Sequence, residues 1–559
     1  MLRKVYKIIF SFFLVFLYQN ITYSKTFDEK NVQNYFSALV SFEENKNIES
    51  LHYFNSSKEL KESHPEYIKK YVFSLILGEK VNKAISEIKT MKDKKFVDFF
   101  EAHLLLALDS IKKNDYKKSL YHINNLKNYE EDGTFKFIIS NFLEEYVHLF
   151  KDKKIKSDLD SQFGKLSLIN RTFQRCYLGH SGTENFFENL INYEEKSNSR
   201  YLFFYANYLL TQKNYLKVKD IFKDVDPISS TLLISQAKKW IDEKNYYDFK
   251  SIFSCKNSND IIGEFLFIIS NLYSMEYEMD NSNFYFNLSN FLNPKFKFNF
   301  VLLVDNYFQN EEFTKAKEIL KNFNKKNEIY YWYRVKKTSQ IIREKNDQDQ
   351  SFEYIKAKFD AIEKPSLKII YEMGNIVKSF EKYDLSIEYY TKILSKLEPT
   401  SIIYADVLYR RGGSYERIGN EQKADEDLLK SLEINPDEPH VLNYLAYSWL
   451  ERNYKIDFAI DMLKKAYAQR KNDPYIIDSI GWAYYLIGDY VEAEKLIRKA
   501  VKIMPTDPIV NDHYGDILWK LDRKLQANYF WKNVLTFEDV KEKMKEDINY
   551  KLLKGPKNS

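Results

Sequence analysis

The chain has 559 residues and a formal net charge of +5, with only 14 glycines, 11 prolines and 2 cysteines. This length exceeds that of one ordinary compact core, so we expect several domains or a repeat array. The nearly balanced charge gives no support to nucleic-acid binding through bulk electrostatics. The scarcity of glycine and proline favours an all-α protein.

Residues 1–24 are typical of a secretory signal peptide. Basic residues come first, a largely apolar run covers residues 8–18, and residues 22–24 offer a cleavage site. The apolar run is too short to span a bilayer by itself. We therefore expect export to the bacterial periplasm, and an inner-membrane anchor that is not cleaved is the alternative.

Residues 25–366 carry an irregular pattern of helical hairpins, with small and large apolar residues at recurring offsets and turn residues between them. The matching positions are Ala38, Ser50, Phe54 and Ser57, then Ala107, Tyr116, Ser119 and Ile123, and then Tyr307, Phe313, Ala316 and Leu320. The aromatic run over residues 199–210 is expected to fill the space between neighbouring hairpins. An exposed patch for a partner is the alternative.

Cys176 and Cys255 are the two cysteines of the chain. They could pair in an oxidising compartment. However, a linear array would hold residues this distant in sequence a repeat or more apart, so we expect two buried free thiols.

The region 367–535 contains a clear repeat of about 34 residues. In the unit that begins at Pro474, the key positions are Ile477, Gly481, Tyr484, Ala493, Ile497, Ala500 and Pro505. Their spacing predicts two helices that bury one apolar face each. Small residues at Gly481, Ala493 and Ala500 allow the two backbones to approach closely. Similar units begin near Ala405, Pro439 and Pro508, and a weaker one lies around Gly374.

These spacings resemble the tetratricopeptide repeat family. The resemblance implies a right-handed superhelical solenoid of antiparallel hairpins with a concave groove. Residues 536–559 follow the array, with Val540, Met544, Ile548 and Leu552 at helical steps. They predict a capping helix over the open end of the array and a disordered tail from Gly555.

Signatures of catalysis or of a bound cofactor are absent from the sequence, which predicts that the protein is not an enzyme. Asp512, His513 and Asp516 stand close together, but His513 lies on a different helix face from the two carboxylates, so we expect no metal site there. An active site hidden within residues 130–360 remains an alternative.

The resemblance also implies that the first helix of each hairpin lines the groove. The candidate partner-binding residues are then His440, Asn443, Tyr447, Tyr475, Asp478, Trp482, Tyr485, Asp512, Asp516 and Trp519. Asn443 matches the carboxylate clamp of the family, but carboxylates occupy positions where that clamp needs cations. We therefore expect the aromatic residues to anchor an apolar segment, and the aspartates to receive lysine, arginine or backbone donors.

These features predict a periplasmic scaffold or adaptor that binds other proteins or peptide segments, with no nucleic acid or small-molecule substrate. Membrane contact is expected only through the N-terminal segment. The chain is similar to exported repeat proteins of Gram-negative bacteria, some of which serve as adaptors. A self-assembling component of the cell envelope is the alternative.

Overall fold

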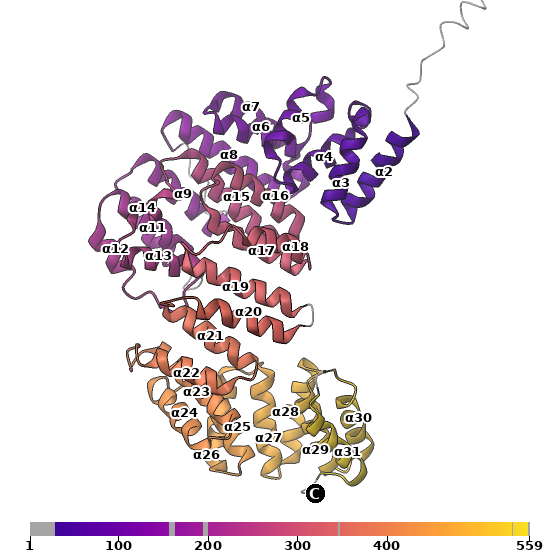
Figure 1. Ribbon diagram of the computed structural model, residues 1–559, viewed down its shortest axis with the longest axis vertical. Helices are drawn as coiled ribbons and strands as arrows, with labels where there is room; N and C mark the ends of the chain where they lie inside the picture. Colours follow the sequence, from indigo (N-terminus) through magenta and orange to yellow (C-terminus); the bar gives the residue numbers. More distant parts are fainter. Residues whose placement is uncertain (1–27, 156–162, 194–198, 345–346, 539, 557–559) are drawn as a thin grey trace, which may run out of the picture. The chain divides into compact units, whose positions relative to one another are not determined.

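The computed structural model describes residues 28–155, 163–193, 199–344, 347–538 and 540–556 (Figure 1). Every regular element within these residues is a helix, which confirms the predicted all-α class. None of the described helices is long and apolar enough to cross a membrane. The predicted signal peptide at residues 1–24 lies outside the described residues.

The helices form two compact units. The first unit comprises residues up to 225 and residues 230–347, and the second comprises residues 226–229 and 348–559. The predicted repeat array, residues 367–535, lies entirely within the second unit.

The α-helices of the first unit are α2 (Glu29–Glu43), α3 (Asn47–Ser56), α4 (Pro65–Leu77), α5 (Val81–Thr90), α6 (Phe100–Lys112), α7 (Tyr116–Leu126), α8 (Thr134–Asp152), α9 (Lys165–Leu178), α10 (Thr183–Ile191), α11 (Ser199–Thr211), α12 (Tyr215–Ile221), α13 (Leu232–Asp242), α14 (Tyr246–Ser251), α15 (Ser258–Met275), α16 (Met279–Leu292), α17 (Phe300–Gln309), α18 (Phe313–Leu320) and α19 (Glu328–Arg343). Its short 3-10 helices are η1 (Lys58–Glu62), η2 (Lys94–Val97), η3 (Lys127–Asp132) and η5 (Lys297–Asn299).

The helices of the second unit are α20 (Gln348–Asp360), α21 (Leu367–Ser379), α22 (Tyr383–Leu394), α23 (Ile402–Arg417), α24 (Glu421–Ile434), α25 (Pro439–Glu451), α26 (Ile456–Gln469), α27 (Pro474–Leu486), α28 (Tyr490–Ile503), α29 (Pro508–Lys520), α30 (Lys524–Val534) and α31 (Glu542–Lys554). From α21 to α30, consecutive helices pair as antiparallel hairpins, as the repeat predicts.

The hairpin of α27 and α28 shows how the sequence specifies this unit. The Asp473 carboxylate accepts hydrogen bonds from the backbone N–H groups of Tyr475 and Ile476, and so caps the first helix. A Cβ atom placed at Gly481 would lie 2.7 Å from the Ile497 side chain, which is fully buried on α28. Glycine at this position is therefore needed for the close approach of the two helices.

The first unit folds back on itself. Its hairpin of α15 and α16 contacts α4, α6 and α8, which lie more than a hundred residues earlier in the chain (Figure 1). The rings of Phe284 and Phe73 stack at 4.7 Å, and those of Phe265 and Phe142 at 5.6 Å. Asn287 donates a hydrogen bond of 2.8 Å to the Ile76 carbonyl in the same contact. Distant hairpins thus share one core.

The aromatic helix α11 belongs to that core. Nine of its residues are buried, and Phe203 stacks on Phe249 with ring centroids 4.8 Å apart. The predicted packing role of residues 199–210 is therefore confirmed for the described part of that run.

Cys176 and Cys255 form a disulfide with a Cα separation of 5.8 Å. The prediction of two free thiols was wrong, because it assumed a linear array in which sequence distance becomes spatial distance. The folding back of the first unit instead brings the end of α9 to the loop before α15. Beside the disulfide, Lys256 donates a hydrogen bond of 2.8 Å to the Tyr177 carbonyl.

Candidate functional site

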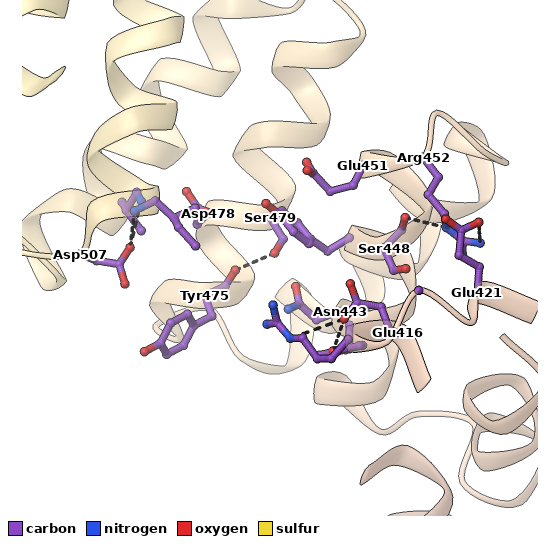
Figure 2. Close-up of a pocket in the computed structure, with 16 residues that line it drawn as sticks. Glu416, Glu421, Asn443, Ser448, Glu451, Arg452, Tyr475, Asp478, Ser479 and Asp507 are labelled. Carbon is purple, nitrogen blue, oxygen red and sulfur yellow. Dashed lines mark hydrogen bonds and ion pairs between the residues drawn. The ribbon is translucent and has the colours of Figure 1, made fainter. Parts of the chain in front are cut away.

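A pocket of about 480 Å³ lies in the second unit, where the first helices of successive hairpins face a common space (Figure 2). Helices α23, α25, α27 and α29, the loop before α24 and the first residue of α24 supply its walls. The lining residues are Glu416, Arg417, Gly419, Glu421, Asn443, Tyr444, Tyr447, Ser448, Glu451, Arg452, Tyr475, Asp478, Ser479, Asp507, Ile509 and Val510. The pocket thus extends along four consecutive repeats.

Four of the predicted groove residues line this pocket: Asn443, Tyr447, Tyr475 and Asp478. Tyr475 is 62% exposed, and Figure 2 shows its ring directed outward, away from the other labelled side chains. Asp478 is buried. The oxygen Oδ1 of Asn443 is buried, and among the described residues it has no hydrogen-bond donor.

The two arginines of the pocket are bound within the chain. Arg452 binds Asp425 at 2.7 Å and Glu421 at 3.2 Å, and it donates to the Ser448 carbonyl. Arg417 lies 3.6 Å from Glu416, which also accepts a hydrogen bond of 3.0 Å from the Tyr444 hydroxyl. Arg452 is therefore held by two carboxylates, whereas the Arg417 side chain is 58% exposed.

Glu451 differs from the other glutamates of the pocket. Its carboxylate accepts a hydrogen bond of 3.1 Å from the Trp482 indole N–H, and among the described residues it forms no ion pair. Burial, together with the negative charges of Glu451, Asp478 and Asp512, raises the pKa of Tyr447 well above its ordinary value. Three carboxylates therefore act on the Tyr447 hydroxyl.

A second pocket, of about 690 Å³, lies between α27, α29 and the C-terminal helix α31. Four further predicted residues line it: Trp482, Tyr485, Asp512 and Asp516. The ammonium group of Lys551 on α31 binds Asp512 at 2.7 Å and Asp516 at 2.8 Å. The chain thus supplies its own cation to these two carboxylates.

Asp478 also has a partner within the chain. The Nδ1 atom of the buried His513 lies 3.0 Å from both of its carboxylate oxygens. The imidazole stacks on Trp482 at 4.1 Å, and Trp482 stacks on Tyr485 at 4.6 Å. We expected Asp478, Asp512 and Asp516 to receive donors from a partner. In the structure, His513 already contacts Asp478, and Lys551 already binds Asp512 and Asp516.

Two pKa shifts accompany this arrangement. Burial alone would lower the pKa of His513, but the bond to Asp478 and the charges of Asp512 and Asp516 raise it above its ordinary value. Burial and the nearby Asp512 raise the pKa of Asp516 to about 6, although Lys551 opposes that rise. Proton binding in this cluster is therefore coupled to the position of α31.

The remaining two predicted residues, His440 and Trp519, line neither of these two pockets. His440 is exposed, whereas Trp519 packs against Trp531 with ring centroids 5.5 Å apart.

Gly555 and Pro556 are buried, and a side chain at Gly555 would collide with Trp519. The predicted disorder from Gly555 is therefore wrong for these two residues, and residues 557–559 lie outside the described part.

Sequence analysis missed Tyr444, Ser448, Arg452 and Ser479 in the first pocket and Lys551 in the second. The first four stand beside the family's groove positions and not on them, so the pattern alone could not select them. Lys551 lies next to the apolar stripe of the predicted capping helix. That stripe predicted packing of the helix, but not which charge would enter the groove.

Within the described ranges, no group of three or more histidine, cysteine or acidic residues is arranged to hold a metal ion.

The first unit contains a pocket of about 550 Å³, which lies within residues 130–360, the range that we gave for a possible active site. Its Arg200 binds Glu264 through two hydrogen bonds of 2.6 and 2.8 Å and Asn299 through a third of 2.9 Å. This charged pair is satisfied within the chain, which is typical of a structural contact.

Comparison with known proteins identifies the repeat. Residues 405–438, which form α23, α24 and the following turn, match the model of the tetratricopeptide repeat family. A TPR repeat-containing protein of Pseudomonas aeruginosa, PA4667, is 31% identical over 111 residues, which are 20% of this chain and 19% of that protein. The chain therefore matches about a fifth of the length of this relative.

Several solved structures are also similar to about a third of the chain. TTC0263, a TPR protein of Thermus thermophilus, is 17% identical, covers 34% of this chain and 100% of its own, and has a TM-score of 0.30. MamA from Desulfovibrio magneticus is 17% identical over 32% of this chain and 97% of its own, with a TM-score of 0.26.

Proposed function

We propose that this chain, a tetratricopeptide-repeat protein, is a non-enzymatic scaffold or adaptor that binds segments of other proteins in the groove of its second unit. Proteins with such repeats generally mediate protein–protein interactions. The observation that carries the proposal is the first pocket, which extends over four consecutive repeats and combines exposed apolar side chains with polar groups. An extended or helical segment suits such a surface.

The shape of the lining favours a polypeptide over a small molecule. Tyr475 and Ile509 are 62% and 49% exposed, and so offer apolar surface at one side of the pocket. Ser448 and Ser479 are small residues in its wall, where they leave room for the side chain of a partner. Binding would combine several weak anchors along the repeats, so that affinity depends on the length of the segment.

We further propose that the protein works in the periplasm. The N-terminal pattern of basic and apolar residues supports export. The buried Cys176–Cys255 disulfide adds support, because such bonds persist in oxidising compartments and are rare in the cytosol. The alternative is that residues 1–24 are retained and anchor the protein in the inner membrane.

Selection of a random peptide library displayed on phage against the full chain tests the binding function. We expect enriched peptides that lose binding by about tenfold or more in Ser448→Trp, because the indole would fill the pocket. The matched control is Ser395→Trp on the exposed end of α22, which should bind like the wild type. Enriched peptides that bind Ser448→Trp as well as the control would contradict the proposal, provided that the circular dichroism of both variants is native.

A further inference from the structure

We propose that the first pocket selects partner segments carrying a lysine or arginine, and that Glu451 on α25 accepts the charge of that side chain. The inference rests on the proposed function and adds the chemistry of the partner. It assigns the contact with a basic side chain to Glu451 and not to Asp478, Asp512 and Asp516, which already have partners within the chain.

The charges of the pocket favour a basic segment over an acidic one. Five carboxylates line it against two guanidinium groups. Arg452 binds Asp425 and Glu421, and the exposed Arg417 lies 3.6 Å from Glu416. An acidic segment would therefore meet more like charges than opposite charges. A basic segment would meet a negative surface that also speeds its encounter with the protein.

Glu451 is the carboxylate best placed to receive a new cation. The Trp482 indole N–H donates a hydrogen bond to it, which reduces the side-chain freedom that binding would remove. Because Glu451 is exposed at the rim of the pocket, its contact with a cation would be screened by salt. The carbon stem of a lysine or arginine could at the same time cover part of the exposed apolar surface.

In the neighbouring pocket, carboxylates on the first helices of the hairpins already bind a lysine of the same chain. There Lys551 of α31 lies between Asp512 and Asp516, with its side chain only 16% exposed. This face of the repeats thus already holds a helix through a lysine and a pair of carboxylates. The first pocket presents related chemistry, with Glu451 still without an ion partner among the described residues.

The test uses the full chain and sets of short fluorescent peptides that differ at one position. Each set starts from an enriched peptide and carries lysine, arginine, acetyl-lysine or glutamate at that position. We expect the lysine and arginine peptides to bind about tenfold more tightly than the acetyl-lysine peptide at low salt, and the difference to shrink at high salt. Glu451→Gln should reduce this preference about threefold and leave acetyl-lysine binding unchanged. Glu433→Gln, which removes the same charge from the exposed surface of α24, is the matched control and should change nothing.

Two outcomes separate this inference from the proposed function. If all four peptides bind equally and Ser448→Trp abolishes their binding, the pocket binds protein segments but does not select a basic residue. If Glu451→Gln and Glu433→Gln weaken lysine binding alike, the preference comes from bulk charge and the role of Glu451 is overturned. If no peptide depends on Ser448, both the inference and the proposed function fail.

Discussion

The two units use the same helical hairpins in different ways. In the first unit, α15 and α16 pack against α4, α6 and α8, so helices distant in sequence share one core. In the second unit, each hairpin mainly contacts its neighbours, and the first helices leave a pocket along four repeats. The first unit therefore buries the faces of its hairpins in a shared core, whereas the second leaves a pocket along them.

The difference can be traced to the helices themselves. Helix α15 is buried on nearly all sides, with residues Ile261 to Phe267 buried without interruption. Such a helix belongs in the interior of a unit. Helix α28 instead buries Ala493, Leu496, Ile497 and Ala500 on one face and leaves its other face to solvent. One-sided burial is what allows a stack of hairpins to keep an open surface.

The largest expected effect comes from breaking the long-range packing of the first unit. Phe284→Ala removes a buried ring that stacks on Phe73, and should lower the free energy of unfolding by about 4 kcal/mol. Phe36→Ala removes the same group from a side chain that is 61% exposed, and should cost less than about 1 kcal/mol. Urea unfolding followed by circular dichroism compares them, and equal losses would mean that α16 does not pack on α4.

Removing the disulfide should have the next largest effect, and only on the first unit. The double change Cys176→Ala and Cys255→Ala opens a link between residues 79 positions apart, and should cost about 3 kcal/mol. Hydrogen exchange should become faster in peptides from α9 and α15, and stay unchanged in peptides from α27 and α29. Faster exchange in both units would show that the disulfide also stabilises the second unit.

Two glycine substitutions compare the tightness of packing in the two units. At Gly481 an added Cβ atom would lie 2.7 Å from Ile497, so Gly481→Ala should cost about 2 kcal/mol. At Gly263 on α15 the shortest such distance is 3.3 Å, and the gain in helix propensity should hold Gly263→Ala within about 1 kcal/mol of the wild type. Melting temperatures of the two variants check this order, and the reverse order would refute it.

The smallest effects concern pH, with opposite signs in the two units. Burial and the nearby His103 lower the pKa of His122 in the first unit to about 4. As the pH falls, the unfolded chain therefore binds this proton at a higher pH than the folded chain does. The stabilisation associated with His122 should therefore grow as the pH rises from about 4 to about 6.5. The pKa of His513 in the second unit is raised by its acidic neighbours, so its stabilisation is complete below about pH 6.5 and declines above it.

Melting temperatures of His122→Asn and His513→Asn, measured from about pH 5 to about pH 8, separate these two contributions. The difference between the wild type and His122→Asn should widen toward neutral pH. The difference between the wild type and His513→Asn should narrow above about pH 6.5. Parallel curves for the two variants would show that the two imidazoles are not held in opposite protonation states.

The sequence predicted the second unit better than the first, for a physical reason. Positions such as Gly481 and Ile497 specify contacts within one hairpin, and those contacts depend only on residues close in the chain. The disulfide between Cys176 and Cys255 arises from the folding back of a whole unit, which local periodicity does not encode. Similarly, the repeat pattern placed Asp512 on the first helix of its hairpin. It could not show that Lys551 of α31 binds Asp512, because the pattern does not specify which side of α31 packs on the repeats.

Hydrogen exchange of the full chain, with and without a selected lysine-bearing peptide, tests most directly that the groove of the second unit is the binding surface. We expect slower exchange confined to peptides from α23, α25 and α27, with no change in α15 and α16. Slower exchange in the first unit, with none in those three helices, would show that the groove is not where partners bind.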